Sequence, residues 1–315
     1  MSETPPRFTS RKIVEARSEK NAVSPKRPYA FHVEPECAAS GRVEDVATLF
    51  LTNRECPLKC LMCDLWKNTT DASVDVGDIP AQIDDALAQL PPAKHIKLYN
   101  SGNFFDPRAI PRDDHAAIAS RVDRFENVIV ENHPRFCGQD CTRFRELLSG
   151  ELEIAIGLET VHADVLGSLN KQMTLDDFEK AVAFLLPNDI AVRAFILLRP
   201  PFMDEAEGVE WALRSVEFAF SRGVRCCSII PTRSGNGIME RLERSGQFAP
   251  PSLESMETVL EQSLKMDRGR VFMDLWDVER FFDCPDCGPA RAARLSEMNL
   301  SQNVLPAIAC HCGAH

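Results

Sequence analysis

The chain has 315 residues and a hydrophobic content of 44%, which fits one large globular domain with appendages or two smaller domains. Its 36 Lys and Arg residues against 47 Asp and Glu residues give a formal net charge of −11, so bulk charge alone does not draw it to nucleic acid. No apolar run reaches the roughly 18 residues of a membrane helix, and residues 1–10 contain no apolar signal core. We therefore expect a soluble, cytoplasmic protein without membrane contact.

Residues 1–45 show little hydrophobic periodicity, which predicts an N-terminal extension. Cationic side chains outnumber acidic ones in this segment; they are Arg7, Arg11, Lys12, Arg17, Lys20, Lys26 and Arg27. Such an extension is either a solvated tail or a strap packed on the core, or it contacts an anionic partner such as RNA. The sequence leaves these alternatives open.

From Val46 onward, short apolar strands alternate with helix-like stretches. The predicted strands are Val46–Leu51, His95–Leu98, Asn127–Val130, Glu153–Gly157, Ala191–Leu198 and Arg225–Ile230. The predicted helices are Ile79–Leu90, Asp113–Phe125, Cys141–Leu148, Leu175–Leu186, Glu205–Arg222 and Leu253–Lys265. This alternation predicts parallel βαβ units with right-handed crossovers, arranged as an open doubly wound sheet or as a partial β/α barrel.

The polarity of the strand faces favours the barrel. Ile154, Ile156 and Leu158 share one face of their strand, whereas Glu153 and Glu159 lie on the other. A sheet covered by helices on both faces reads as continuously apolar, whereas a polar inner face fits a barrel that holds a ligand near the strand C-termini. We therefore predict an α/β fold with a partial (β/α)6 TIM-type barrel over residues 46–245. Residues 246–315 are predicted to form a C-terminal extension with a small cysteine-rich cap.

The 12 cysteines are many for a long chain without a secretion signal, and they indicate metal binding or catalysis rather than disulfides. Cys56, Cys60 and Cys63 form a C-x3-C-x2-C motif just after the first predicted strand. Three thiolates without an adjacent fourth ligand suit an iron–sulfur cluster with one open iron better than a closed tetrahedral zinc site. A zinc or purely structural role for the motif is the alternative.

The chain resembles the radical S-adenosylmethionine (SAM) superfamily over roughly residues 46–240, because that superfamily carries a C-x3-C-x2-C motif on the loop after its first barrel strand. The resemblance implies that Cys56, Cys60 and Cys63 hold a [4Fe–4S] cluster whose fourth iron binds the amino and carboxylate groups of SAM. It also implies that the reduced cluster passes one electron to SAM, giving methionine and a 5′-deoxyadenosyl radical that takes a hydrogen atom from the substrate. The implied electron donor is a protein such as a flavodoxin or a ferredoxin.

The resemblance further implies SAM contacts outside the cysteine loop. Met62 stands where the family usually has an aromatic residue near the adenine. Ser101, Gly102 and Asn103 stand in place of a Gly-Gly-Glu-like turn that receives the SAM amino group. Asn103 brings no negative charge, but its amide oxygen can accept a hydrogen bond.

Four more residues match positions near the ribose, methionine or adenine of SAM: Glu131, Glu159, Arg193 and Asn236. Arg193 is expected either to meet the SAM carboxylate or to pair with Glu159. The alternative is that Glu131, Glu159 and Arg193 form buried ion pairs inside the barrel.

Within the superfamily, the phrases 98–104, 131–136, 157–160 and 199–202 resemble the radical subunit of archaeosine synthase and its uncharacterised bacterial relatives. The next most similar group resembles the catalytic subunit of Elongator. This likeness implies a modified nucleoside in tRNA as the substrate. A small anionic metabolite or a peptide is the alternative, because inward-facing Arg199 and Arg233 are suited to bind its carboxylate or phosphate.

A second cysteine cluster lies near the C-terminus. Cys284 and Cys287 belong to a C-P-x-C-G turn, and Cys310 and Cys312 follow as a C-x-C pair. Two pairs of thiolates are typical of structural zinc. An auxiliary iron–sulfur cluster and unmetallated thiols are the alternatives.

His133, Cys137 and Cys141 are candidate catalytic residues, since all three come just after the third predicted strand of the barrel. A hydrogen-bonded interior histidine and two ordinary thiols are the alternatives. A hypothesis from a different class is a non-catalytic zinc or iron–sulfur module that binds RNA or a protein partner. A fourth cysteine ligand closing the first cluster, such as Cys37, would favour that module.

Overall fold

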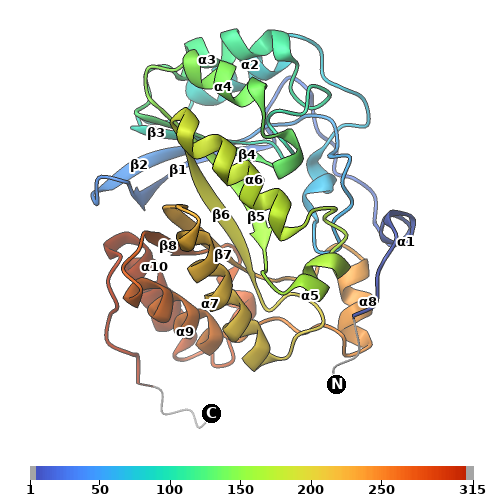
Figure 1. Cartoon of the computed structure of the whole chain (residues 1–315), viewed down its shortest axis with the longest axis vertical. Coiled ribbons are helices and arrows are strands. Elements are labelled where there is room, and N and C mark those ends of the chain that lie inside the picture. The colour runs from blue at the N-terminus through green and yellow to red at the C-terminus, as the bar shows by residue number, and fades with distance from the viewer. Residues whose placement is uncertain (1–4, 310–315) are drawn as a thin grey trace.

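The structure, a computed structural model, describes residues 5–309 and is built around one curved sheet of eight strands (Figure 1). The strands lie in the sheet in their sequence order, β1 antiparallel to β2 and all later neighbours parallel. Their bounds are β1 Ala30–Cys37, β2 Val43–Phe50, β3 His95–Tyr99, β4 Asn127–Asn132, β5 Glu151–Glu159, β6 Ile190–Leu198, β7 Cys226–Pro231 and β8 Arg270–Met273. Because β8 does not pair with β1, the barrel is open, as predicted.

Ten α-helices connect and cover these strands in the described part of the chain. They are α1 Ser10–Glu15, α2 Asp78–Leu87, α3 His115–Val122, α4 Gln139–Glu146, α5 Ala163–Ser168, α6 Leu175–Leu185, α7 Glu205–Ser221, α8 Ile238–Arg244, α9 Leu253–Lys265 and α10 Gly288–Ser301. Figure 1 shows α2, α3 and α4 grouped at one end of the curved sheet and α7, α9 and α10 at the other. None of the described helices is long and apolar enough to cross a bilayer.

The main core lies between the outer face of the sheet and these helices. Ile154, Ile156 and Leu158 of β5 are fully buried in it, as the strand polarity predicts. The inner face carries polar side chains instead, and Glu153 there is 3% exposed. The hydrophobic effect thus stabilises the sheet through its outer face, whereas charged and polar side chains occupy the inner face of the barrel.

Two strands extend the sheet beyond the six that the pattern predicts. β1 lies in the predicted N-terminal extension, and its Pro35 fits there because an edge strand tolerates a missing N–H donor. β8 lies in the predicted C-terminal extension and pairs with β7. The acidic residues Glu34 and Glu36 make β1 hard to recognise from sequence, and in the fold their charges are balanced by cations from other strands.

The segment from α1 to Lys20 is a strap packed on the barrel, one of the alternatives that the sequence leaves open for residues 1–45. Ile13 of α1 is 1% exposed and packs in a cluster that includes Ile238 of α8. Farther on, Arg17 and Lys20 form ion pairs of 2.7 and 2.9 Å with Glu55, the residue before the first cysteine of the motif. Part of the positive charge of the strap is therefore neutralised within the protein.

Candidate active site

The cysteine loop follows β2 at the C-terminal end of the parallel strands, where barrel enzymes place their sites. Asn236 holds it from the loop after β7, since its Nδ2 donates to the carbonyl oxygens of Leu61 at 2.7 Å and Cys63 at 3.1 Å. Asn170 holds its other side by donating to the carbonyl of Lys59 at 2.6 Å. Distant loops thus fix the backbone between the three cysteines.

Cys56, Cys60 and Cys63 are free thiols of intermediate exposure. Burial raises the pKa of all three thiols, that of Cys60 to about 11, and negative charge on one raises the pKa of the next. They therefore lie close enough to interact by charge, yet no hydrogen bond joins any two of them. Three neighbouring thiols that are not hydrogen-bonded to one another suit a [4Fe–4S] cluster, in which each cysteine binds a different iron.

A buried cation lies beside these thiols. Lys171 forms an ion pair with Glu159, and its charge lowers the pKa of Cys60 and Cys56. Burial lowers the pKa of Lys171 itself, but the carboxylate of Glu159 outweighs this and the net shift is upward. Lys171 therefore stays charged and offsets the negative charge that thiolates bring. No sequence pattern singles out Lys171, because it is distant from the cysteines in the sequence and comes near them only in the folded protein.

The turn Ser101–Asn103, after β3, adjoins the cysteine loop as the resemblance implies. Asn103 is 3% exposed, and its Nδ2 donates to Cys56 Sγ at 3.2 Å. Beneath the turn, Glu131 Oε1 accepts from the backbone N–H of Asn100 at 2.6 Å and of Gly102 at 3.3 Å. Burial raises the pKa of Glu131, while these N–H groups lower it. Glu131 thus shapes the turn through its backbone.

Tyr29, just before β1, completes this side of the site. Its hydroxyl lies 2.9 Å from Ser101 Oγ, and burial raises its pKa well above 10. No sequence pattern marks Tyr29 as a site residue, because it lies in the segment predicted as an extension. The register of β1 against β2 is what brings it to the turn.

Arg193 differs from its expected role: it does not pair with Glu159. Its guanidinium binds Glu153 at 2.5 Å and Glu36 at 2.7 Å and is 2% exposed. The register explains this, because Glu159 is opposite Ile196, three residues or about 10 Å farther along β6. Arg193 therefore belongs to a buried ion-pair network below the site, the alternative considered for it.

Two other predicted SAM contacts have structural partners. Asn236 is 3% exposed, and its amide is occupied by the cysteine loop and by the N–H of Met239, which donates to Oδ1 at 2.9 Å. Met62 packs against the apolar cluster around Leu61 and Leu169. Both therefore stabilise the loop that carries the thiols.

The three candidate catalytic residues lie after β4, in different settings. His133 Nδ1 accepts from the N–H of Arg135 and its Nε2 donates to the carbonyl of Lys171, each at 3.1 Å. Burial lowers its pKa to about 4, so it is a neutral, hydrogen-bonded interior histidine. Cys141 is 0% exposed within the main core, which contradicts a role in contact with substrate. Cys137 is half-buried and remains a candidate.

Cys284 and Cys287 lie far along the chain, directly before α10, and both are buried. Their partners in the predicted second cluster, Cys310 and Cys312, lie outside the described residues. Cys37, considered as a fourth ligand for the first cluster, is buried beside Cys226 and Phe272.

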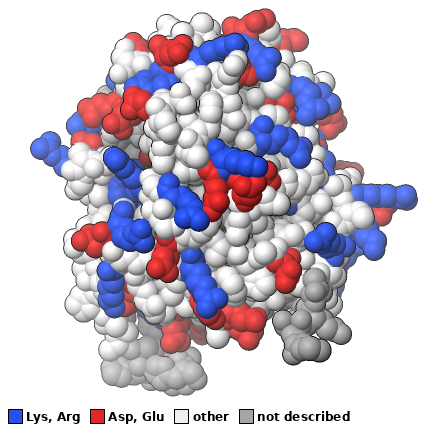
Figure 2. Space-filling view, in the orientation of Figure 1, with Lys and Arg blue, Asp and Glu red and all other residues white. Residues whose placement is uncertain are grey.

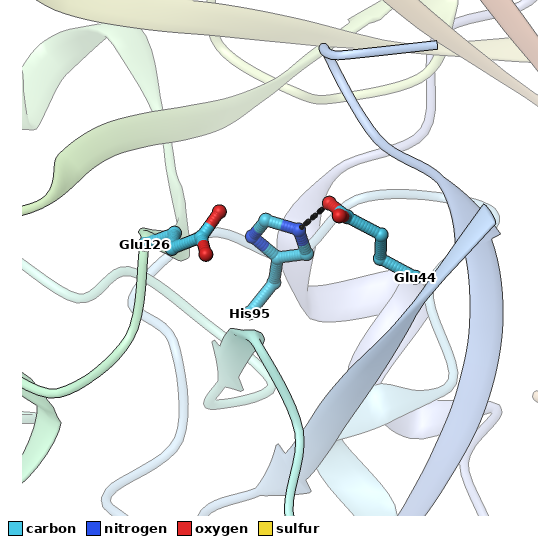
Figure 3. Close-up of side chains that lie close together, drawn as sticks. All are labelled: Glu44, His95 and Glu126. Carbon is cyan, nitrogen blue, oxygen red and sulfur yellow. Dashed lines mark hydrogen bonds and ion pairs between the residues drawn. The ribbon is translucent and has the colours of Figure 1, made fainter. Parts of the chain in front are cut away.

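One further group of ligand-type side chains lies at the opposite end of the strands. Figure 3 shows the ring of His95 between the carboxylates of Glu44 and Glu126, with Nε2 2.9 Å from Glu44. Lys94 reaches both carboxylates, at 2.6 and 3.7 Å. Because Lys94 and His95 already bind the carboxylate of Glu44, and Glu126 is exposed, we assign no metal there.

Comparison with known proteins gives distant relatives. An uncharacterised protein of Methanocaldococcus jannaschii is 24% identical over 96% of this chain and 89% of its own length. An archaeosine synthase subunit beta of Methanosarcina acetivorans is 26% identical over 65% of this chain, and one of Thermococcus kodakarensis is 27% identical over 57%. The matches span 61% and 57% of these two subunits. No protein-family model matches the chain.

Two solved structures share the fold at 14% identity. An N-terminally truncated archaeal Elp3 of Methanocaldococcus infernus matches with a TM-score of 0.52 over 71% of this chain and 59% of its own. Methylornithine synthase matches with a TM-score of 0.51 over 81% of this chain and 70% of its own.

Proposed function

Since its relatives and its fold relate this chain to the radical SAM superfamily, we propose that it is an enzyme that reductively cleaves SAM. Cys56, Cys60 and Cys63 would hold the [4Fe–4S] cluster. When bound, this cluster supplies the electron that breaks the C5′–S bond of SAM and so starts hydrogen abstraction from the substrate. The observation that carries the proposal is that three free thiols on one loop lie close enough to interact by charge, with the cation Lys171 beside them.

Residues around the loop would bind and orient SAM. Asn103 donates to Cys56 with its amide nitrogen, and within residues 5–309 its amide oxygen accepts no hydrogen bond, so it is free for the SAM amino group. Glu131 and Tyr29 hold the turn that carries Asn103. Glu159, at the end of β5, forms an ion pair with Lys171, the cation beside the thiols.

The strap would exclude water from the cluster side. Trp66, three residues after the last cysteine of the motif, is 3% exposed. The guanidinium of Arg17 lies 4.6 Å from the centroid of its ring, a cation–π contact that fixes the strap over the loop. A dry surrounding strengthens the electrostatic interactions inside the site.

The test is anaerobic reconstitution with iron and sulfide, followed by assay for 5′-deoxyadenosine with dithionite and SAM. We expect product from the native chain, none from Cys60→Ser, and undiminished product from Cys37→Ser as the matched cysteine control. A native chain that holds a cluster and forms no 5′-deoxyadenosine would contradict the proposal. Replacing dithionite by reduced flavodoxin or ferredoxin tests the electron donor.

For the substrate, we propose a modified nucleoside in tRNA. The support is the name of two relatives, archaeosine synthase subunit beta. For the alternative, a small anionic metabolite or a peptide, the two candidate arginines each have an acidic partner in the protein: Arg199 is paired with Glu205 and Arg233 with Asp274. Figure 2 shows Lys and Arg interleaved with Asp and Glu on the face it presents, so that face has no continuous basic surface for RNA.

Mass spectrometry of nucleosides from tRNA, incubated with the reconstituted enzyme, SAM and reductant, tests this substrate. We expect a change in the mass of one nucleoside that requires SAM and Cys60. If 5′-deoxyadenosine forms but tRNA nucleosides stay unchanged, and a peptide or metabolite pool is altered instead, the tRNA assignment is wrong while SAM cleavage stands.

A further inference from the structure

The amide of Asn103 gives a hydrogen bond that a carboxylate at the same position could not give. Its Nδ2 donates to Cys56 Sγ at 3.2 Å, and Asn103 is 3% exposed. An amide has N–H donors and an oxygen acceptor, whereas a carboxylate and a metal-bound thiolate can only accept hydrogen bonds. A buried N–H donor is therefore directed at one of the three sulfurs that are proposed to bind iron.

The backbone around Asn103 is anchored on both sides. The N–H of Phe104 donates to the carbonyl of Glu131 at 2.9 Å, and the N–H of Asp106 donates to the carbonyl of Asn103 at 3.1 Å. On the other side, the carboxylate of Glu131 accepts from the N–H of Gly102 at 3.3 Å. These bonds fix the turn, so the position of the Asn103 amide beside Cys56 is set by the backbone of the barrel.

A second buried amide belongs to the same turn. Asn100 is 0% exposed, and neither polar atom of its side chain has a hydrogen-bond partner within residues 5–309. A Cβ built on Gly102 would lie 3.7 Å from Asn100 Nδ2 and 3.7 Å from the Cβ of Cys56, so this amide is close to the cysteine. A buried polar group without a partner costs about 1–3 kcal/mol. The turn beside Cys56 thus fits a group with acceptor atoms, such as the sulfurs of an iron–sulfur cluster.

An N–H group directed at a cluster sulfur favours the reduced state of the cluster. Reduction adds one electron and makes the sulfur atoms more negative. Hydrogen bonds to a more negative acceptor are stronger, so the bond stabilises the reduced cluster more than the oxidised one. Hydrogen bonds to the sulfurs are accordingly among the factors that set the reduction potential of iron–sulfur clusters. A donor at Cys56 therefore raises this potential.

We propose that Asn103 is a positioning residue that raises the reduction potential of the cluster through its N–H···S bond to Cys56. This inference rests on the proposed binding of a [4Fe–4S] cluster by the three cysteines of the loop, and it does not depend on SAM. A higher potential makes the transfer of one electron from the donor protein to the cluster more favourable. Lys171 acts in the same direction through its charge, and it is present in every variant compared below.

The test is a redox titration of the anaerobically reconstituted full chain without SAM, with the reduced cluster measured by EPR. At the same solution potential we expect a ratio of reduced to oxidised cluster about tenfold smaller in Asn103→Ala, or a reduction potential about 59 mV lower. Asn103→Asp should lie lower still, because it loses the donor and adds a negative charge. The matched control is Asn132→Ala: Asn132 is 4% exposed and donates to Cys137 Sγ at 3.5 Å, outside the cluster loop, so the potential should stay unchanged.

Equal potentials for the native chain and Asn103→Ala would overturn the inference, even if Asn103→Asp is lower, because charge alone would then act at this position. A role of Asn103 in SAM binding only would give the same equal potentials.

A measurement on the unaltered chain guards against variants that do not assemble a cluster. With asparagine labelled by ¹⁵N, pulsed EPR of the reduced native chain should detect the amide nitrogen at the cluster, and its absence would also overturn the inference. A native chain that shows this signal and forms no 5′-deoxyadenosine would contradict the proposed SAM cleavage and leave the role of Asn103 standing.

Discussion

The hydroxyl of Tyr29 lies 2.9 Å from the hydroxyl of Ser101 and ties the antiparallel edge of the sheet to the turn beside the cysteines. Ser101 has a positive φ of 52°, a conformation that costs energy for a residue with a side chain. The contacts from Tyr29 and from Glu131 below the turn oppose that cost. The edge strand thus contributes to the site as well as to the sheet.

Tyr29→Phe should weaken SAM binding and leave the fold intact. Loss of one buried hydrogen bond costs about 1 kcal/mol, which corresponds to roughly a fivefold higher Kd. Tyr99→Phe is the matched control, because the Tyr99 ring packs against Phe50 and Phe195 and its hydroxyl makes no hydrogen bond within residues 5–309. Isothermal titration of the reconstituted protein with SAM measures both; equal Kd values for the two variants would contradict a role for the Tyr29 hydroxyl.

Gly157→Ala should disrupt the Glu159–Lys171 ion pair. A Cβ at Gly157 would clash with the carboxylate of Glu159 and the ammonium of Lys171. Both atoms are the ends of flexible side chains, so we expect them to move apart and to take the cation away from the thiols. Gly138→Ala meets no atom within 4 Å and is the control. Urea unfolding and iron content after reconstitution report the effect; a Gly157 variant that matches the control in both would contradict it.

Asn236→Ala should loosen the cysteine loop. The change leaves the carbonyls of Leu61 and Cys63 without their donor, at a cost of about 1–3 kcal/mol for each buried group left unpaired. We expect a lower urea midpoint and faster loss of iron to a chelator. Asn188→Ala, at an exposed site, should change stability by less than about 0.5 kcal/mol. Unchanged iron retention in Asn236→Ala would show that the cysteine loop keeps its conformation without the Asn236 side chain.

The buried network around Arg193 should make stability depend on acid pH. Burial raises the pKa of Glu36, but Arg193 and Lys97 lower it more, so its folded value lies below the unfolded value of about 4.3. Its contribution is therefore present above about pH 4.3 and is lost as the pH falls toward the folded pKa. We expect the free energy of unfolding to fall steeply below about pH 4.5.

Glu36→Gln tests this network. Removing one partner of a buried ion pair costs about 3–5 kcal/mol at neutral pH. The deficit should shrink as the pH falls below about 4.3, because Glu36 then takes up a proton in the unfolded chain while it stays ionised in the fold, which lowers the stability of the native protein toward that of the variant. Glu217→Gln, on the exposed face of α7, is the control and should follow the native curve. Urea unfolding between pH 3.5 and 7 measures all three proteins. A deficit that is the same at every pH would argue against titration of Glu36.

Local patterns in the sequence determined the parallel strands β2–β7, several helices and the cysteine motif. Apolar alternation marks a strand wherever one face is buried, and a C-x3-C-x2-C spacing puts three thiols on one short loop regardless of what surrounds it. The capping box Thr174–Asp177 likewise fixed the start of α6 from neighbouring residues alone.

Tertiary structure alone decided which distant residues meet at that loop. Lys171 and Tyr29 reach it from two separate segments, and nothing local in their sequences marks them. The register of β5 against β6 assigned Arg193 to Glu36 and Glu153 instead of Glu159. The periodicity of apolar residues indicates only which face of a strand is buried. Contacts between charges that are distant in the sequence depend on strand register and on the path of the chain, and neither can be read from a short stretch of sequence.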